Sequence, residues 1–441
     1  MIDRDLQHLV EISKKDHTLE FYLSLTRGRS VERKDGKLFL VEDYQDLALT
    51  VRTISCKEEK KGRLFGKAGL SLTLSLAQDA VEQAISRAKA LAEYGKDVIL
   101  PDLPLNYPEV KIIPAKFLTH EEMQEWLDSA KESLGEFPKI IRVEKENFAI
   151  EEEQIFLIKE GKILSFRSPT YSYSVSVISE NGRSAQAYAY NSTRELERLD
   201  ARKLFRKACK MASALAKAKK RETIRCAVLF PPDTAIILLD LLSFSFLGDE
   251  VEKGRSKLRD KLGKKVFSEE ITIIDDGLLE FLPEGRPFDD EGIPQERTIL
   301  VEKGTVKNYL LDSLSADHLG LASNGKARRL TLGQNPRPQP TNLYIEKGSQ
   351  TKEKLLQAEN YVFEVFEVLG AHTADPVSGE FSFGVSGVLY YKGEIVDYLS
   401  EMALTGNIFE VFERDILLGE DLVFYDNLGA PSILIPEMTL G

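Results

Sequence analysis

The sequence predicts an α+β protein with duplicated β-hairpin, strand and helix units in its N-terminal half and a mostly β C-terminal domain with a few helices. Three observations support this fold class. Two segments of alternating polar and apolar residues flank tight turns, as in hairpins. The same layout recurs at an offset of roughly 120 to 125 residues, which indicates a duplication. Beyond Ile224, short apolar runs alternate with glycine, asparagine and proline turns.

The first unit begins with an amphipathic helix and continues into a hairpin at residues 31–54, which turns at Asp35 and Gly36. A second turn at residues 60–63 leads to a further strand. A helix follows, with Asp79 as its expected N-cap. The expected apolar face of that helix consists of Ala80, Ala84, Ala88, Leu91 and Ala92.

The second unit repeats this order, with turns near Gly161 and Gly182 and a helix after Asp200. A proline-containing linker at residues 97–120 separates the two units, and Thr119 opens the next helix through a capping box with Glu122. The helix after Asp200 is dense in lysine and arginine. A solvated helix face is the favoured interpretation of these cations, and a patch for an acidic partner or nucleic acid is the alternative.

These patterns divide the chain into an N-terminal unit at 1–105, a second unit at 106–220 and a β-rich domain at 221–441. The last domain begins with a buried strand that ends at Pro231 and Pro232, followed by an apolar helix. Residues 379–407 predict a meander of three strands, with a tight turn at Lys392 and Gly393. A short helix and a last strand complete the domain.

The composition argues against several functional classes. The net charge is -12 and the isoelectric point is about 5.2, so binding to nucleic acid or to an anionic membrane is not expected. The three cysteines have no metal-binding or disulfide spacing, which fits a reducing cytoplasm. Neither a signal peptide nor a membrane-spanning segment is expected. Nucleophile-elbow, P-loop and dinucleotide-binding motifs are absent from the sequence.

The C-terminal half carries motifs that resemble the TldD/PmbA family, whose members are also described as modulators of DNA gyrase. They comprise IIDD at 273–276, the runs at 287–312 and 315–329, Asn342 and Leu343 with Gly348, and the runs at 378–395 and 405–422. The similarity extends over essentially the whole chain, with 221–441 as the TldD/PmbA domain. The resemblance implies a cytoplasmic two-subunit metalloprotease that acts on unfolded peptides, in peptide maturation and proteolysis.

The resemblance also distinguishes two kinds of subunit. In the TldD kind, a helix carries HExxxH, in which two histidines bind zinc and the glutamate serves as general base. In register, this motif falls on residues 239–244, where Leu239 and Phe244 occupy the ligand positions. Asp240 alone cannot hold a metal, and the family's C-terminal cysteine ligand has no counterpart after Cys226. The resemblance therefore implies a PmbA/TldE-like subunit with no catalytic or zinc-binding residues of its own.

The polar residues of the family motifs admit two interpretations. Asp275, Asp276 and residues 289–291 can form turns at strand ends or can bind Mg²⁺ or Ca²⁺, and turns are favoured. The cations at residues 326–329 can hold a peptide carboxylate or can pair with the acidic cluster. The candidate binding or interface residues are Asp240, Asp289, Asp290, Glu291, Arg297, Lys326, Arg328, Arg329 and Asn342.

The leading hypothesis is a non-catalytic subunit that pairs with a TldD-like metalloprotease and handles peptide substrates. Zinc is expected only in that partner, and a homodimer is a further expectation when the partner is missing. One alternative is an independent hydrolase that uses the acidic cluster and a divalent metal. Another is a non-enzymatic, peptide-binding regulator. Enzymatic activity of the isolated chain stays open, and the missing ligands favour an inactive chain.

Overall fold

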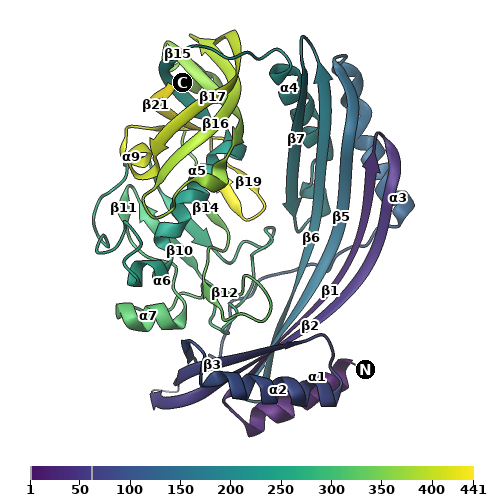
Figure 1. Ribbon diagram of the computed structural model, residues 1–441, viewed down its shortest axis with the longest axis vertical. Coiled ribbons are helices and arrows are strands. Elements are labelled where there is room, and N and C mark those ends of the chain that lie inside the picture. The colour runs from purple at the N-terminus through teal and green to yellow at the C-terminus, as the bar shows by residue number, and fades with distance from the viewer. Residues whose placement is uncertain (1, 61–62) are drawn as a thin grey trace.

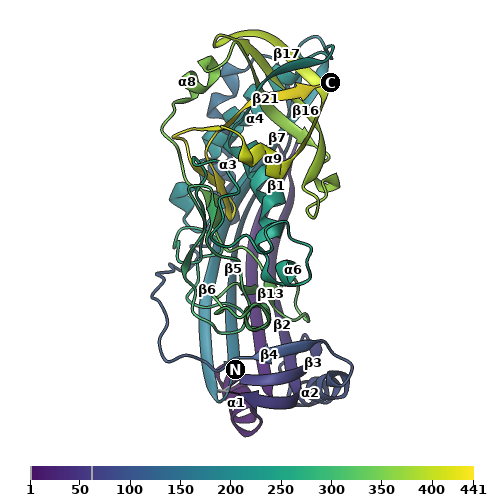
Figure 2. The same cartoon turned by 90° about the vertical axis from the view of Figure 1, so that its left-hand side faces the viewer.

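The computed structural model describes residues 2–60 and 63–441 (Figures 1 and 2). Strands account for 43% and helices for 24% of the chain, which confirms the predicted α+β class. A long curved sheet forms one side of the molecule, and the C-terminal half lies along the other side (Figure 1). The predicted turn at 60–63 includes residues 61 and 62, which lie outside the described residues.

The N-terminal half forms one antiparallel seven-stranded sheet in the order β4-β3-β2-β1-β5-β6-β7. Its strands are β1 Leu19–Lys34, β2 Lys37–Lys60, β3 Arg63–Thr73, β4 Asp97–Leu100, β5 Ile140–Lys159, β6 Lys162–Glu180 and β7 Ser184–Thr193. The two units predicted from the sequence meet where β1 pairs with β5, with Glu20 opposite Lys159. One sheet therefore joins them, and the division at residue 105 stays a prediction.

The hairpin turns follow the predicted chemistry. Asp35 and Gly36 have φ angles of 52° and 72°, and Glu160 and Gly161 have 53° and 70°. Positive φ at both central residues is the geometry of a type I′ turn, which matches the twist of the flanking strands. Both long hairpins of the sheet therefore turn through the same backbone conformation.

Four helices accompany this sheet: α1 Ile2–Lys15, α2 Gln78–Ala92, α3 His120–Ala130 and α4 Ala201–Leu215. Thr119 and Glu122 form the predicted capping box of α3, and Asp200 caps α4 by accepting a hydrogen bond from the Lys203 N–H. The prediction for α2 was wrong in detail. Its N-cap is Ala77. Asp79 lies in the first turn instead, where its carboxylate interacts favourably with the helix dipole.

Two further details differ from the sequence prediction. Leu91 is 51% exposed, and Val81 takes a place on the buried face of α2 instead. The linker contains one short strand, β4, because residues 97–100 pair with β3. Between β4 and α3 the described chain has no regular structure, as its prolines predict.

The C-terminal half contains two six-stranded sheets and one short pair of strands. The first sheet has the order β11-β10-β9-β14-β20-β19. Its strands are β9 Ile273–Asp276, β10 Arg297–Glu302, β11 Thr305–Val306, β14 Leu343–Ile345, β19 Val423–Tyr425 and β20 Leu428–Ala430. The short pair is β12 Ala327–Arg328 with β13 Arg337–Pro338.

The second C-terminal sheet has the order β17-β16-β15-β8-β21-β18. Its strands are β8 Ile224–Phe230, β15 Tyr361–Leu369, β16 Glu380–Tyr391, β17 Glu394–Asn407, β18 Leu417–Leu418 and β21 Ile433–Leu440. Leu404 of β17 also pairs with Leu440 of β21, so this sheet curls back on itself. The predicted three-stranded meander was wrong: two long strands, β16 and β17, span that segment and meet at the predicted turn.

Five helices complete the C-terminal half: α5 Pro232–Ser243, α6 Gly248–Glu252, α7 Ser313–Leu319, α8 Lys352–Gln357 and α9 Ile408–Glu413. Helix α5 contacts β8 and β15 of one sheet and β19 and β20 of the other. Ala235, Leu238, Leu239 and Leu242 are fully buried there. Burial of each leucine side chain stabilises the fold by about 1.5–3 kcal/mol, so α5 is a scaffold element of the core.

A helix needs about 20 predominantly apolar residues to span the hydrocarbon core of a bilayer. Among the helices of the described residues, none is both long and apolar enough to cross one.

Candidate functional site

The helix position that the family resemblance singles out lies on α5. Leu239 is fully buried in the core, Phe244 is half-buried against it, and Asp240 is exposed. Strands β19 and β20 pack beside α5, and they belong to the C-terminal region in which the family's cysteine ligand has no counterpart. Leucine and phenylalanine have no lone pair to donate, and these residues therefore do not fit a zinc ion.

The carboxylate of Asp289 closes a local turn. Its Oδ1 accepts hydrogen bonds from the backbone N–H groups of Glu291 and Ile293, both at 2.9 Å. Its Oδ2 accepts a third, from Ala327 N–H at 3.0 Å. Both oxygens of this buried side chain thus hold backbone segments in place, as an Asx turn does.

Asp290 binds groups from three different segments. Its Oδ1 accepts from Arg286 Nη1 at 2.9 Å and from the Tyr22 hydroxyl at 3.2 Å. Its Oδ2 accepts from the backbone N–H of Arg329 at 2.7 Å. Within residues 2–60 and 63–441, no group of three or more His, Cys, Asp or Glu side chains is arranged to hold a metal ion. These contacts favour the structural interpretation of the acidic cluster.

Lys326 and Asp275 form an ion pair in which both side chains have no exposed surface, with Nζ 2.8 Å from Oδ2. Thr341 donates both its backbone N–H and its hydroxyl to Asp275, each at 2.6 Å. The Lys326 ammonium also donates to the Glu296 carbonyl at 2.8 Å. Because Lys326 is enclosed, it cannot reach a peptide carboxylate from solvent.

A second buried set of charges joins the long sheet to the C-terminal half. We call Glu20, Arg52, Lys159 and Arg329, together with the backbone carbonyl of Glu291, the interdomain ion network. Glu20 of β1 accepts from Arg52 of β2 at 2.7 Å and from Arg329 at 2.6 Å, and all three side chains are 1% exposed. Lys159 of β5 donates to the Glu291 carbonyl at 3.2 Å. The network therefore locks the loop that follows β12 onto the sheet.

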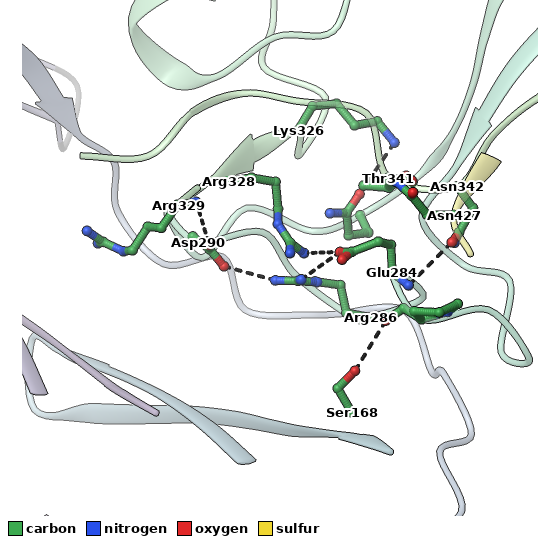
Figure 3. Close-up of polar contacts among 12 residues, drawn as sticks. Ser168, Glu284, Arg286, Asp290, Lys326, Arg328, Arg329, Thr341, Asn342 and Asn427 are labelled. Carbon is green, nitrogen blue, oxygen red and sulfur yellow. Dashed lines mark hydrogen bonds and ion pairs between the residues drawn. The ribbon is translucent and has the colours of Figure 1, made fainter. Parts of the chain in front are cut away.

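Arg328 and Asn342 belong to a neighbouring cluster around Glu284 (Figure 3). Arg286 and Arg328 both reach the Glu284 Oε2, the former at 2.8 Å. The Asn342 Oδ1 accepts from the Glu284 N–H at 3.3 Å, and its Nδ2 donates to the Asp276 carbonyl at 2.8 Å. Arg328 thus pairs with Glu284, an acidic residue of its own domain that lies outside the predicted acidic cluster.

The structure brings seven of the nine candidate residues together and leaves two apart. Arg297 on β10 is 44% exposed and lies 3.5 Å from Glu346 and 3.9 Å from Asp276. Asp240 on α5 forms no side-chain hydrogen bond or ion pair with any described residue. Sequence reasoning missed Glu20 and Arg52, although a charged residue inside an apolar strand, as in LEFYL and TVRTI, signals a buried partner.

Glu291 makes the stability of this region depend on pH. Burial first, and then the charges of Asp312 and Asp289, raise the pKa of Glu291 from 4.5 to about 8. Its carboxylate accepts only the Ser313 N–H, at 2.9 Å, as a hydrogen bond from a described residue. Because the folded state binds this proton more tightly than the unfolded state, Glu291 contributes stability that is fully present below pH 4.5 and is lost as the pH rises through about 8.

We therefore expect the free energy of unfolding to decrease between about pH 5 and about pH 8.5, and to decrease less in the Glu291→Gln variant. Urea titrations at a series of pH values measure this dependence. Glu353→Gln, on the surface of α8, is the matched control and should follow the wild type. Identical pH profiles for the wild type and Glu291→Gln would contradict the assignment.

Comparison with known proteins assigns the chain to a class. Residues 223–441 match the model of the PmbA/TldA metallopeptidase C-terminal domain, so the C-terminal half is a domain of the metallopeptidase class. Metalloprotease PmbA of Escherichia coli O157:H7 is 25% identical over 97% of this chain and 93% of that protein. Residues 223–441 therefore form a C-terminal domain of the TldD/PmbA type.

Other relatives align over a shorter stretch. An uncharacterized protein of Methanocaldococcus jannaschii is 36% identical over 45% of this chain and 47% of its own length. The chain thus spans about half the length of the first relatives that it matches.

Solved structures share the whole fold. A candidate modulator of a DNA gyrase from Thermotoga maritima superposes with a TM-score of 0.87 at 21% identity, and both chains are covered completely. TldE from Thermococcus kodakarensis superposes with a TM-score of 0.82 at 19% identity, over 99% of this chain and 100% of that one. At these identities the likeness establishes the fold alone.

Proposed function

We propose that this chain is the zinc-free, PmbA/TldE-like subunit of a cytoplasmic protease whose TldD-like partner supplies the metal and the catalytic residues. One observation carries the proposal. The helix position of the family's zinc motif is filled by Leu239 and Phe244, which pack into the core beside β19 and β20. A helix built in this way serves as scaffold, and peptide hydrolysis then requires a second subunit.

The role that we assign to this chain is to form and stiffen one wall of a chamber for unfolded peptides. The long sheet and the C-terminal half are held together by the interdomain ion network, whose charges are buried. A buried network of this kind resists relative motion of the parts, because opening it would expose unpaired charges. When the partner is missing, we expect the chain to pair with a second copy of itself.

The two alternative functions receive less support. An independent hydrolase would need carboxylate oxygens free to bind a metal, but backbone and side-chain donors already occupy those of Asp289 and Asp290. A peptide-binding regulator without a protease partner stays a prediction. Co-purification from the native cell separates it from our proposal, which requires a homologue with HExxxH to accompany this chain.

The proposal makes a direct biochemical prediction. The purified chain should contain no stoichiometric zinc by elemental analysis and should not cleave unfolded casein, whereas adding the HExxxH homologue from the same genome should produce zinc-dependent cleavage. In the assembled complex, Asp240→Asn should retain activity within about twofold, because the aspartate holds no metal. Changing the motif glutamate of the homologue to glutamine should abolish cleavage. Zinc-dependent cleavage by this chain alone would overturn the proposal.

A further inference from the structure

The basic helix α4 lines a cavity of about 470 Å³ between the sheet domain and the C-terminal half. We call this cavity the basic cleft. In Figure 1, α4 lies between the sheet and the C-terminal strands. The cationic side chains lining the cleft are Arg202, Lys203, Arg206, Lys207, Lys210 and Lys352. Its volume lies within the roughly 300–1,000 Å³ that is usual for ligand pockets.

Three acidic residues line the basic cleft, and each already has a partner. Asp200 is the N-cap of α4 and accepts the Lys203 backbone N–H at 2.8 Å. Asp233 lies 2.6 Å from Lys207, which also donates to the Tyr425 hydroxyl at 3.0 Å. Glu364 is buried, pairs with Lys352 and accepts from the Tyr390 hydroxyl at 2.9 Å. These contacts neutralise two of the cations and fix the floor of the cleft.

Of the other four cations of the cleft, two pair with carboxylates outside its lining and two lysines have no partner among the described residues. Arg202 and Arg206 pair with Glu132 and Glu136 respectively. Lys203 and Lys210 are exposed, and neither ammonium group forms a hydrogen bond or ion pair with a described residue. Seven residues separate them, which is two helical turns, so they lie on the same face of α4. The cleft therefore presents two free positive charges in a protein whose net charge is -12.

The remaining wall of the cleft is apolar. Met211, Pro231 and Phe366 line it beside the lysines. A ligand that fits must combine negative charge with apolar groups, which describes a peptide with acidic and hydrophobic side chains. A nucleic acid is less suitable, because its affinity comes largely from pairing many phosphates with lysine and arginine, and only two lysines are free here.

We propose that the basic cleft binds an acidic peptide segment, whose carboxylates pair with Lys203 and Lys210 and whose apolar side chains pack on Met211 and Phe366. This inference rests on the proposed function for the identity of the peptide as a substrate of the two-subunit protease. It defines the substrate class: unfolded chains with carboxylates next to hydrophobic residues. Electrostatic attraction in a partly apolar cleft favours such segments over neutral or basic ones.

Fluorescence anisotropy on the isolated chain tests the inference with a short fluorescein-labelled peptide that alternates glutamate with leucine. The Lys203→Gln/Lys210→Gln variant should bind this peptide at least about tenfold more weakly than the wild type, and added salt should weaken wild-type binding. The same peptide with glutamine in place of glutamate should bind the wild type as weakly as the acidic peptide binds the variant. Both lysines are exposed, so the variant should remain folded.

Lys162→Gln/Lys220→Gln removes the same charge from exposed positions outside the cleft and should bind the acidic peptide like the wild type. Equal binding by wild type and the Lys203/Lys210 variant, or equal binding of the acidic and neutral peptides, would overturn the inference. So would tighter binding of a single-stranded oligonucleotide that the same variant loses. Binding by the isolated chain without cleavage by the complex would leave the cleft intact and refute the proposed function. Cleavage by the complex without a preference for acidic peptides would support the proposed function and refute the role of the basic cleft in choosing substrates.

Discussion

Replacing Lys326 with methionine is expected to lower the free energy of unfolding by about 3–5 kcal/mol. The substitution keeps most of the side-chain volume but leaves the carboxylate of Asp275 without its counter-ion, in a place where neither side chain has any exposed surface. Thr341 alone cannot replace a full positive charge. Urea denaturation followed by circular dichroism measures the change.

Two further variants make this prediction specific. Adding Asp275→Asn to Lys326→Met should recover at least about 1 kcal/mol, because the double variant no longer buries an unpaired charge. Lys347→Met, at an exposed position of the same domain, should stay within about 0.5 kcal/mol of the wild type. A Lys326→Met protein as stable as this control would show that the pair contributes nothing.

Replacing Glu20 with alanine should cost about as much, in the range of 3–5 kcal/mol, because it leaves two buried guanidinium groups near each other without an anion. Arg52 and Arg329 each place an Nη2 within 2.7 Å of a Glu20 oxygen, and both side chains are 1% exposed. Since Arg329 belongs to the C-terminal half, the damage should concentrate at the contact between the two halves. Relative to the wild type, the Glu20→Ala variant should show a larger increase in hydrogen exchange in the loop around Arg329 than in β16 and β17.

The control for this variant is Glu42→Ala, on an exposed part of β2. It should change neither the stability by more than about 0.5 kcal/mol nor the exchange around Arg329. If Glu20→Ala unfolds like the wild type and exchange near Arg329 is unchanged, the interdomain ion network does not hold the halves together. Glu20→Gln should give an intermediate loss, because an amide keeps one acceptor but no charge.

Local chemistry made much of this fold predictable. The turns at Asp35 and Gly36, and at Lys392 and Gly393, require positive φ, and the sequence places glycine where such backbone is adopted without strain. The capping residues Thr119 and Asp200 also act as expected. Strand pairing across long separations could not be read in the same way, because alternation predicts which face is buried and not which strand lies alongside.

In the candidate site, too, contacts between sequence neighbours could be predicted and contacts between distant residues could not. The turn-forming role of Asp289 follows from its neighbours in sequence, since its acceptors bind N–H groups two and four residues further on. The partners of Arg329 and Lys159 lie on other strands or loops, hundreds of residues away in the first case. Only the folded chain identifies these partners. It shows that the loop at residues 326–329, which resembled an anion site in the sequence, forms buried structural contacts instead.

The pairing of β1 with β5 affects how the protein folds during synthesis. The β1–β2 hairpin is complete by residue 60, but the second edge of β1 stays unpaired until residue 159 has emerged. An open strand edge can pair with the wrong chain, and pairings between distant residues form slowly. Nascent chains that end between these two points should therefore be the species most prone to aggregate and most dependent on chaperones.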